Sequence, residues 1–349
     1  MILSIFIALI GLVVGQIIIH PYLNILRVPQ ELQYFAALYA RILLVGYPII
    51  VFYNYCSAVL RAYGNSQTPL KAMIVASVTN IVLDVFAVYV LKWGVAGAAI
   101  ATVIAQLLAG TICAVKIWKT EELRFGKTEL KKEITLCITL SKLGAPVAAQ
   151  NIVIAFGAMV VAAVVNGFGT TFIAGYTATN KLYGLLEIAG ISYGYAITTY
   201  VGQNYGAKLY DRIKSGMRAA LWISMVTSVV IGVAMVVFGR KITMLFISSD
   251  LPEMAAAAGD TAYLFLFIMS VFLPVLYLLH VYQSALRGMG NTVIPMISGI
   301  IEFVMRVGLA LIVGFTGMST GVFWAEVAAW AGAAFFMMFH YYRGIRKMH

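Results

Sequence analysis

The sequence predicts an all-α integral membrane protein made of two related helix bundles. Of its 349 residues, 62% are hydrophobic and only 11% are charged, which is too little polar surface to coat a water-soluble body of this size. The second observation is an internal repeat, in which Leu60-Arg-Ala-Tyr-Gly-Asn returns as Leu286-Arg-Gly-Met-Gly-Asn, 226 positions later. A repeat of this kind in an apolar chain predicts a duplicated membrane bundle.

Ten stretches of about 20 or more mostly apolar residues are long enough to cross a bilayer as α-helices. Continuous runs of this length argue against a transmembrane barrel, whose strands alternate over about 10 residues. Because Met1 opens directly into an apolar run without a basic leader, we expect the first segment to remain as a span. In chain order the expected spans are 2–24, 33–60, 69–91, 94–115, 143–165, 171–202, 217–239, 261–286, 293–315 and 320–342.

Each copy of the repeated motif is a basic turn between two apolar helices. The first turn follows the second span and the second turn follows the eighth, so an even number of helices separates them. The two halves therefore run parallel and are related by an axis along the membrane normal. The matched turn residues are Arg61, Gly64, Asn65 and Pro69 in the first copy and Arg287, Gly290, Asn291 and Pro295 in the second.

One long polar connection, Trp118 to Lys142, follows the fourth span and mixes Glu with Lys. We interpret residues 119–142 as a cytoplasmic linker between a four-helix bundle at 1–118 and a six-helix bundle at 143–349. The repeat turn comes after four helices in the second half but after only two in the first. By this symmetry, we expect the chain to lack the first two helices of a bundle of six plus six.

The distribution of basic residues predicts the orientation. With both termini in the cytoplasm, the cytoplasmic loops and tail hold seventeen Lys and Arg residues, and the opposite side holds Arg27, Lys92, Arg240 and Lys241. Cytoplasmic loops of membrane proteins carry such an excess. The net charge of +11 is then mostly an orientation signal, and its scatter over many loops argues against a nucleic-acid partner.

Several motifs together carry a family resemblance over nearly the whole chain. In their order and spacing they resemble the multidrug and toxic compound extrusion (MATE) transporters, particularly those of Gram-positive bacteria. The resemblance implies twelve helices in two parallel bundles, a bacterial cell membrane, and efflux of bulky, often cationic, organic compounds driven by entry of Na⁺ or H⁺. The motifs are Leu60–Pro69, Asn80-Ile-Val-Leu-Asp84, Gly94–Thr102, Leu143-Gly-Ala-Pro146, Thr199–Ala207 and Leu286–Thr292.

The expected span 171–202 carries a polar stripe. Tyr176, Asn180, Tyr183 and Glu187 are spaced i, i+4, i+7 and i+11 on one helix face, and Lys181 lies beside them. An unpaired charge inside a membrane costs about 3 kcal/mol, so intramembrane polar residues mark candidate sites for an ion or a cationic substrate. We interpret this stripe as a wall of the substrate cavity. Alternatively, Lys181 and Glu187 lie at a shallow, water-exposed end of the helix.

Gln150 and Asn151 follow Pro146 in the expected span 143–165. A proline can loosen the backbone ladder of a helix and leave carbonyl groups free to bind an ion, so we assign this pair to the same cavity. Ordinary hydrogen bonding between helices explains the pair equally well.

Charged residues also occur at repeat-related places in two other spans. Asn80 and Asp84 share one helix face, Glu302 and Arg306 share another, and Asn80 and Arg306 are 226 positions apart. Because Glu302 can neutralise Arg306 within one helix, a structural ion pair is our first interpretation, and a role in ion or substrate binding is the second. Asp84 is either an ion-coupling residue or a solvated residue near the outer end of its span.

The chain departs from the family pattern at the position where some relatives carry a glutamate just beyond the proline. Ile154 or an apolar neighbour stands there, so that coupling group is missing. Glu326 and Arg41 are charges without an evident partner in the sequence. His20, His280 and His340 show no ligand spacing to each other, so we expect no metal site and no cofactor other than the coupling ion.

These observations favour a monomeric, cation-coupled antiporter that works by alternating access. The first alternative is a lipid-linked oligosaccharide flippase of the same superfamily, whose basic cavity would need Arg41, Lys181 and Arg306 to converge. A second alternative is a truncated transporter that is inactive. An enzyme is disfavoured because the spans show no His or Asp cluster with catalytic spacing, and a channel because most helices lack a polar stripe.

Overall fold

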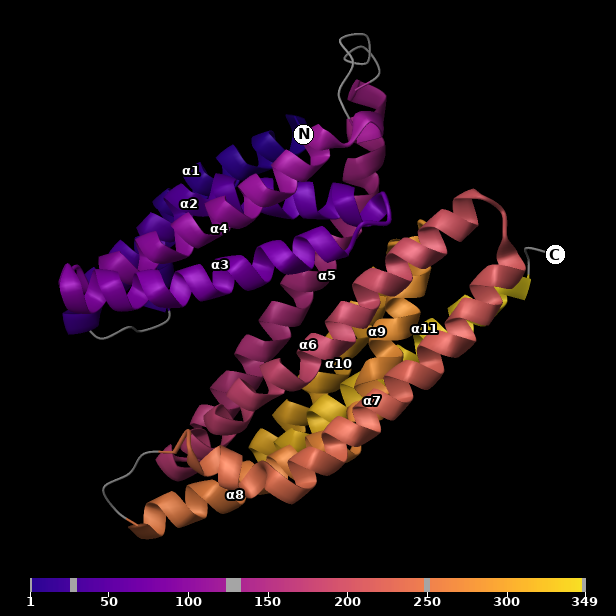
Figure 1. The fold of residues 1–349 in the computed structure, drawn as a ribbon. Coiled ribbons are helices and arrows are strands. Elements are labelled where there is room, and N and C mark those ends of the chain that lie inside the picture. The colour runs from indigo at the N-terminus through magenta and orange to yellow at the C-terminus, as the bar shows by residue number, and fades with distance from the viewer. Residues whose placement is uncertain (1, 26–29, 124–132, 248–251, 347–349) are drawn as a thin grey trace. The chain divides into compact units, whose positions relative to one another are not determined.

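The computed structural model describes residues 2–25, 30–123, 133–247 and 252–346, and every regular element in these ranges is helical (Figure 1). The chain forms two compact units, Met1–Cys137 and Ile138–His349, which we call the N-terminal and C-terminal lobes. The predicted all-helical membrane fold is therefore confirmed. Four long helices precede the lobe boundary, which falls just after the start of the fifth.

The N-terminal lobe is held together by small residues at its helix contacts. α2 and α4 approach closely where Gly46 faces Val103 and where Gly110 faces Phe52. The glycines permit this approach, since an added Cβ at either position would clash with the facing side chain. α4 also packs on α3, and α1 packs on α2. The elements are α1 (Ile2–Ile25), α2 (Gln30–Ala62), α3 (Gln67–Val85), the π-helix η1 (Phe86–Val90), α4 (Gly94–Lys119) and the short 3₁₀ helix η2 (Glu121–Leu123).

The C-terminal lobe has a larger aromatic core. α6 packs on α7, α8 and α9, and α11 packs on α9 and α10. The ring of Phe265 stacks on that of Phe323 with centroids 4.5 Å apart, and both side chains are fully buried. The elements are α5 (Glu133–Asn166), α6 (Thr170–Gly206), α7 (Tyr210–Met244), α8 (Pro252–Val271), α9 (Leu273–Gly288), α10 (Val293–Thr316) and α11 (Gly321–Arg346).

Nine described helices are long and apolar enough to cross a bilayer. Eight of them match expected spans, the ninth covers only the first part of the expected span 261–286, and none corresponds to the expected span 171–202. That span is α6, which is 37 residues long but carries the polar stripe of Tyr176 to Glu187. The expected span 261–286 is divided at Phe272 into α8 and α9, with Pro274 in the first turn of α9. The physical reason is that a proline removes a backbone donor and fits best at a helix start.

The two repeat turns have the same local structure. Gly64 and Gly290 both have a positive φ, 93° and 78°, which ends each preceding helix with a left-handed residue. The side-chain oxygens of Asn65 and Asn291 each accept a hydrogen bond, at 3.1 Å, from the amide three residues later. The asparagines thereby cap the starts of α3 and α10. The prolines that follow, Pro69 and Pro295, are buried in both copies.

The predicted linker 119–142 is only partly described. Residues 124–132 lie outside the described ranges, as do Arg27 and Lys347, two of the basic residues counted in predicting the orientation. α5 begins at Glu133, within the predicted linker rather than at residue 143. The expected span began too late because Thr135 to Lys142 mixes polar with apolar residues. These residues are nevertheless helical throughout and lead into the apolar part of α5.

Candidate functional site

A cavity of about 340 Å³ lies inside the C-terminal lobe, among side chains of α5, α6, α8, α9, α10 and α11. Most of its wall is apolar, but five acidic or basic side chains reach it from four different helices. These are Glu187 of α6, His280 of α9, Glu302 and Arg306 of α10, and Glu326 of α11. We call this site the acidic cavity.

Arg306 is the electrostatic centre of the acidic cavity. Its Nη2 atom lies 2.9 Å from Glu326 Oε2 and 3.9 Å from Glu302 Oε2. The side chains of Arg306, Glu302 and Glu326 are only 7%, 6% and 14% exposed, so the group is largely removed from water. The predicted ion pair within α10 is therefore the longer of two, and the nearer partner comes from α11. Glu326, which had no evident partner in the sequence, is paired.

The face of α6 with the i, i+4, i+7, i+11 spacing lines the acidic cavity along its length, through Tyr176, Asn180, Tyr183 and Glu187. Two of its rings are fixed by stacking. Tyr176 lies on Phe265, with centroids 5.1 Å apart, and Tyr183 lies on Trp330 at 5.8 Å. Stacked rings lose little further entropy when they meet a ligand, so this wall is already arranged for binding.

Lys181 does not line the acidic cavity, in contrast to its predicted place there. Its Nζ lies 6.0 Å from the ring centroid of Phe246, and the residue is exposed. Successive residues of an α-helix point about 100° apart, so a residue beside the stripe is turned away from it. The cavity thus contains one lysine or arginine side chain, Arg306, among the residues that the structure describes.

His280 adds a contact that the sequence did not indicate. Its Nε2 lies 3.3 Å from Glu187 Oε1, and both side chains are largely buried. The imidazole packs against Gly190, where an added Cβ would lie 2.9 Å from His280 Cδ2. No sequence motif joins α6 to α9, so only the fold could reveal this pair. Across the described ranges, no group of three or more His, Cys, Asp or Glu side chains is placed to hold a metal ion.

Gln150 and Asn151 differ in their surroundings, and neither lines the acidic cavity. α5 passes through Pro146 without a break. The Gln150 side chain is fully buried, and its Oε1 accepts a hydrogen bond of 2.7 Å from Arg287 Nη2. Asn151 points to the exposed side of α5. For Gln150, ordinary hydrogen bonding between helices is therefore what the structure shows, and it ties α5 to the second repeat turn.

In the N-terminal lobe, Asn80 and Asp84 lie near the end of α3, immediately before the π-helix η1. Asp84 Oδ1 and Asn80 Nδ2 are shielded from solvent, and neither atom has a hydrogen-bond partner among the described residues. A buried carboxylate oxygen without a partner is costly, so the pair is a candidate for binding an ion. The residue as a whole is only half-buried, so Asp84 stays either an ion-coupling residue or a partly solvated one.

The three intramembrane cations considered for a basic cavity have separate surroundings. Arg41 belongs to the N-terminal lobe, where its Nη2 donates a hydrogen bond of 2.8 Å to His20 Nε2. Lys181 approaches Phe246, and Arg306 is paired with Glu326. Ile154 does line the acidic cavity and contributes apolar surface there.

Two related proteins of Bacillus subtilis resemble this sequence. The probable multidrug resistance protein YoeA is 29% identical over 68% of this chain and 53% of its own length. The probable multidrug resistance protein YpnP is 28% identical over 80% of this chain and 62% of its own length. The chain thus spans between half and two thirds of the length of these relatives.

Solved structures show the same fold. A MOP superfamily transporter from Pyrococcus furiosus superposes with a TM-score of 0.88 at 22% identity, covering 99% of this chain and 77% of that one. A mutant of the Vibrio cholerae MATE transporter VcmN gives 0.89 at 19% identity, with 99% and 78% covered. The MatE family model matches residues 1–86 and 146–312, which is more than half of the sequence. The chain is a multi-pass membrane protein that belongs to the MatE family.

Proposed function

We propose that this chain exports organic cations across the bacterial cell membrane by alternating access, in exchange for Na⁺ or H⁺. The observation that carries the proposal is the charge balance of the acidic cavity. Three carboxylates, Glu187, Glu302 and Glu326, share the cavity with one guanidinium, that of Arg306, and with the imidazole of His280 beside Glu187, so the carboxylates outnumber the permanent positive charges. Carboxylates in excess of their partners are expensive inside a membrane, so a cation is the ligand that such a cavity favours.

The aromatic wall suits flat organic cations. The rings of Tyr176 and Tyr183 line the cavity, and a cation over an aromatic face gains about 0.5–2 kcal/mol. A volume of about 340 Å³ falls in the usual range for small-molecule sites. Apolar lining by Ile154 and Leu276 adds non-directional contact, which accommodates ligands of different shape.

Coupling follows from competition for the same carboxylates. A proton or Na⁺ that neutralises Glu187 or the Arg306 cluster weakens the attraction for an organic cation, and by linkage the organic cation weakens binding of the coupling ion to the same degree. Asp84 with Asn80 supplies a second candidate ion site, in the other lobe. Both sites use oxygen ligands, so the choice between Na⁺ and H⁺ stays open in this proposal.

The flippase alternative lacks comparable support. A lipid-linked diphosphate would require several cations around one cavity. Among the described residues, Arg306 is the one arginine or lysine that lines the acidic cavity, and it is already paired with two carboxylates. The names of the relatives, as probable multidrug resistance proteins, favour drug export. We further propose that the protein works as a monomer with both termini in the cytoplasm.

The transport test uses the chain reconstituted in vesicles loaded with ethidium. We expect dye to leave against its gradient only when an inward Na⁺ or H⁺ gradient is imposed. Replacing Glu187 by Gln should slow this coupled export at least severalfold. Glu253→Gln, a matched change at an exposed position of α8, should leave it unaltered. Export that continues at the same rate without any ion gradient would reject the antiport mechanism.

A further inference from the structure

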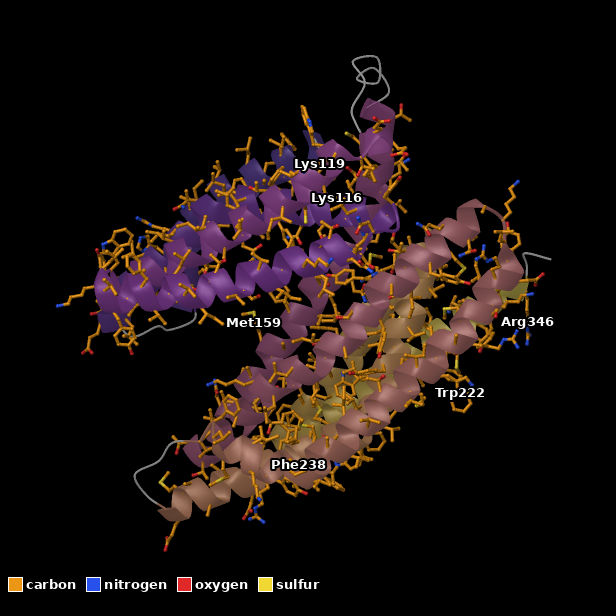
Figure 2. All side chains as sticks on the ribbon, viewed as in Figure 1. Lys116, Lys119, Met159, Trp222, Phe238 and Arg346 are labelled. Carbon is orange, nitrogen blue, oxygen red and sulfur yellow. The ribbon has the colours of Figure 1, made fainter. Side chains whose placement is uncertain are left out.

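A second site lies on the outside of the C-terminal lobe, between the start of α7 and the end of α11. Two cavities, of about 360 and 500 Å³, adjoin there and share Tyr342 as a common wall. Figure 1 shows these two helix ends close together within the lobe, and Figure 2 labels Arg346 at one of them and Trp222 further along α7. We call the two cavities together the basic groove.

The rim of the basic groove is positively charged. Lys214 and Arg218 of α7 line the cavity of about 360 Å³, and Arg343 and Arg346 of α11 line the adjoining cavity of about 500 Å³, on the other side of Tyr342. Lys214 pairs with Asp211 at 3.4 Å. The three arginines are exposed, and no carboxylate of the described residues forms an ion pair with them. The groove therefore presents guanidinium groups that can bind an anion.

The floor of the groove is apolar and begins directly below this rim. On α7, Leu221 follows Arg218 by one turn, and on α11, Phe339 and Phe335 precede Arg343 by one and two turns. α7 begins at this end of the lobe and α11 ends there, so the two helices run in opposite directions. Both therefore change from charged to apolar with increasing distance from this end. Across the floor, Tyr342 Oη lies 3.3 Å from Tyr282 Oη of α9, which closes the groove from beneath.

Such a gradient matches one class of molecule. Guanidinium groups bind phosphate oxygens in a bidentate manner, and an acyl chain fills apolar grooves between membrane helices. Trp222, 72% exposed and one turn below Arg218, has the position expected of an indole at the membrane–water interface. A free anion would leave the apolar floor unused, and an uncharged lipid would leave the arginines unused.

We propose that the basic groove binds an anionic membrane phospholipid, with its phosphate among Arg218, Arg343 and Arg346 and one acyl chain along the α11 floor. The predicted orientation puts this end of the lobe at the cytoplasmic leaflet, which carries most anionic lipid. The groove shares no lining residue with the acidic cavity. Lipid binding at the groove is therefore independent of the proposed transport function and is measured without it.

The test titrates the delipidated, detergent-solubilised chain with fluorescent dioleoyl phosphatidylglycerol. We expect saturable binding that weakens about fivefold with each of R218Q, R343Q and R346Q, because a basic residue at a membrane surface contributes about that factor. The control is R212Q. Arg212 is exposed at the same end of α7 but lines neither cavity, so its loss should leave the affinity unchanged.

Three comparison ligands distinguish the groove from weaker explanations. Dioleoyl phosphatidylcholine, dihexanoyl phosphatidylglycerol and inorganic phosphate should each compete at least tenfold less well than the long-chain anionic lipid. Equal competition by phosphatidylcholine, or by phosphate, would overturn the proposal, as would an R212Q effect as large as that of R343Q. Matching thermal unfolding midpoints for all four arginine variants exclude a general loss of fold.

Discussion

The guanidinium of Arg306 on α10 contacts the carboxylate of Glu326 on α11 at 2.9 Å, with both side chains largely buried. This cross-helix pair joins two neighbouring helices of the C-terminal lobe and orients the only arginine that lines the acidic cavity among the described residues. Since Glu302 also approaches Arg306, at 3.9 Å, the cluster holds two carboxylates against one guanidinium. Its stability and its ligand preference follow from that imbalance.

The first prediction concerns the unequal roles within this cluster. Arg306→Met leaves two buried carboxylates without a counter-charge, so it should lower the free energy of unfolding by about 3–5 kcal/mol. Glu326→Gln leaves Glu302 to neutralise Arg306 and should cost about 1–2 kcal/mol. Thermal unfolding of the purified protein in detergent measures both, with Glu253→Gln as the exposed control. An R306M variant as stable as E326Q would contradict this ranking.

The second prediction concerns the aromatic wall of the acidic cavity. Tyr183→Phe keeps the ring that stacks on Trp330, so binding of tetraphenylphosphonium should stay within about twofold. Tyr183→Leu removes the ring face and should weaken binding about tenfold, the equivalent of about 1.4 kcal/mol. Equilibrium dialysis with the radiolabelled cation measures the difference. If both variants bound the cation equally well, the ring would have no part in recognition.

A third prediction tests the close contact between α5 and α10. An added Cβ at Gly299 would lie 2.6 Å from Gln150 Cγ, so Gly299→Ala displaces the side chain that Arg287 holds. We expect a loss of about 1–2 kcal/mol in unfolding free energy. Gly308, on the same helix, has nothing within 4 Å of that position, and Gly308→Ala should be neutral or stabilise by up to about 1 kcal/mol. Equal stabilities for the two variants would refute the contact.

The repeat turns give a fourth prediction. Gly290 has a φ of 78° with open space around it, so Gly290→Ala costs only backbone strain, about 1–2 kcal/mol. Gly290→Asn should cost less, because asparagine tolerates the left-handed region. Gly64→Ala should behave like its repeat partner, with Gly344→Ala in α11 as the helical control. The thermal unfolding midpoints of the four variants test this prediction. If Gly290→Ala lowered the midpoint no more than Gly344→Ala does, the backbone strain at Gly290 would be refuted.

The sequence predicted correctly those features that depend on one helix or one turn alone. The spacing of Tyr176, Asn180, Tyr183 and Glu187 is a property of one helix, so the shared face could be read directly from the sequence. The repeat of Gly64 and Asn65 at 290 and 291 likewise predicted two turns of one structure. The break at Phe272 could not be predicted from Pro274 alone. Pro48 stands 226 positions earlier, at the matching place of the first copy, and α2 continues through it.

Contacts between helices could not be predicted in this way. Glu326 meets Arg306 because α11 packs beside α10, and His280 meets Glu187 because α9 packs beside α6. A single sequence does not show which helices pack together, so neither pair could be predicted from it. Lys181 was misplaced for a simpler reason, since adjacency in sequence places neighbours on different faces of a helix. The pairing of Gln150 with Arg287 likewise depends on tertiary packing, which the pattern around Pro146 does not encode.

The most direct test of the central claim is equilibrium binding of tetraphenylphosphonium to the purified chain, with and without Na⁺ and between pH 8 and pH 5. We predict that one of the two ions lowers the affinity at least tenfold, and that Glu187→Gln weakens binding and reduces this antagonism while Glu253→Gln preserves both. If the affinity for tetraphenylphosphonium changed neither with Na⁺, nor with pH, nor on Glu187→Gln, the result would contradict cation exchange in the acidic cavity.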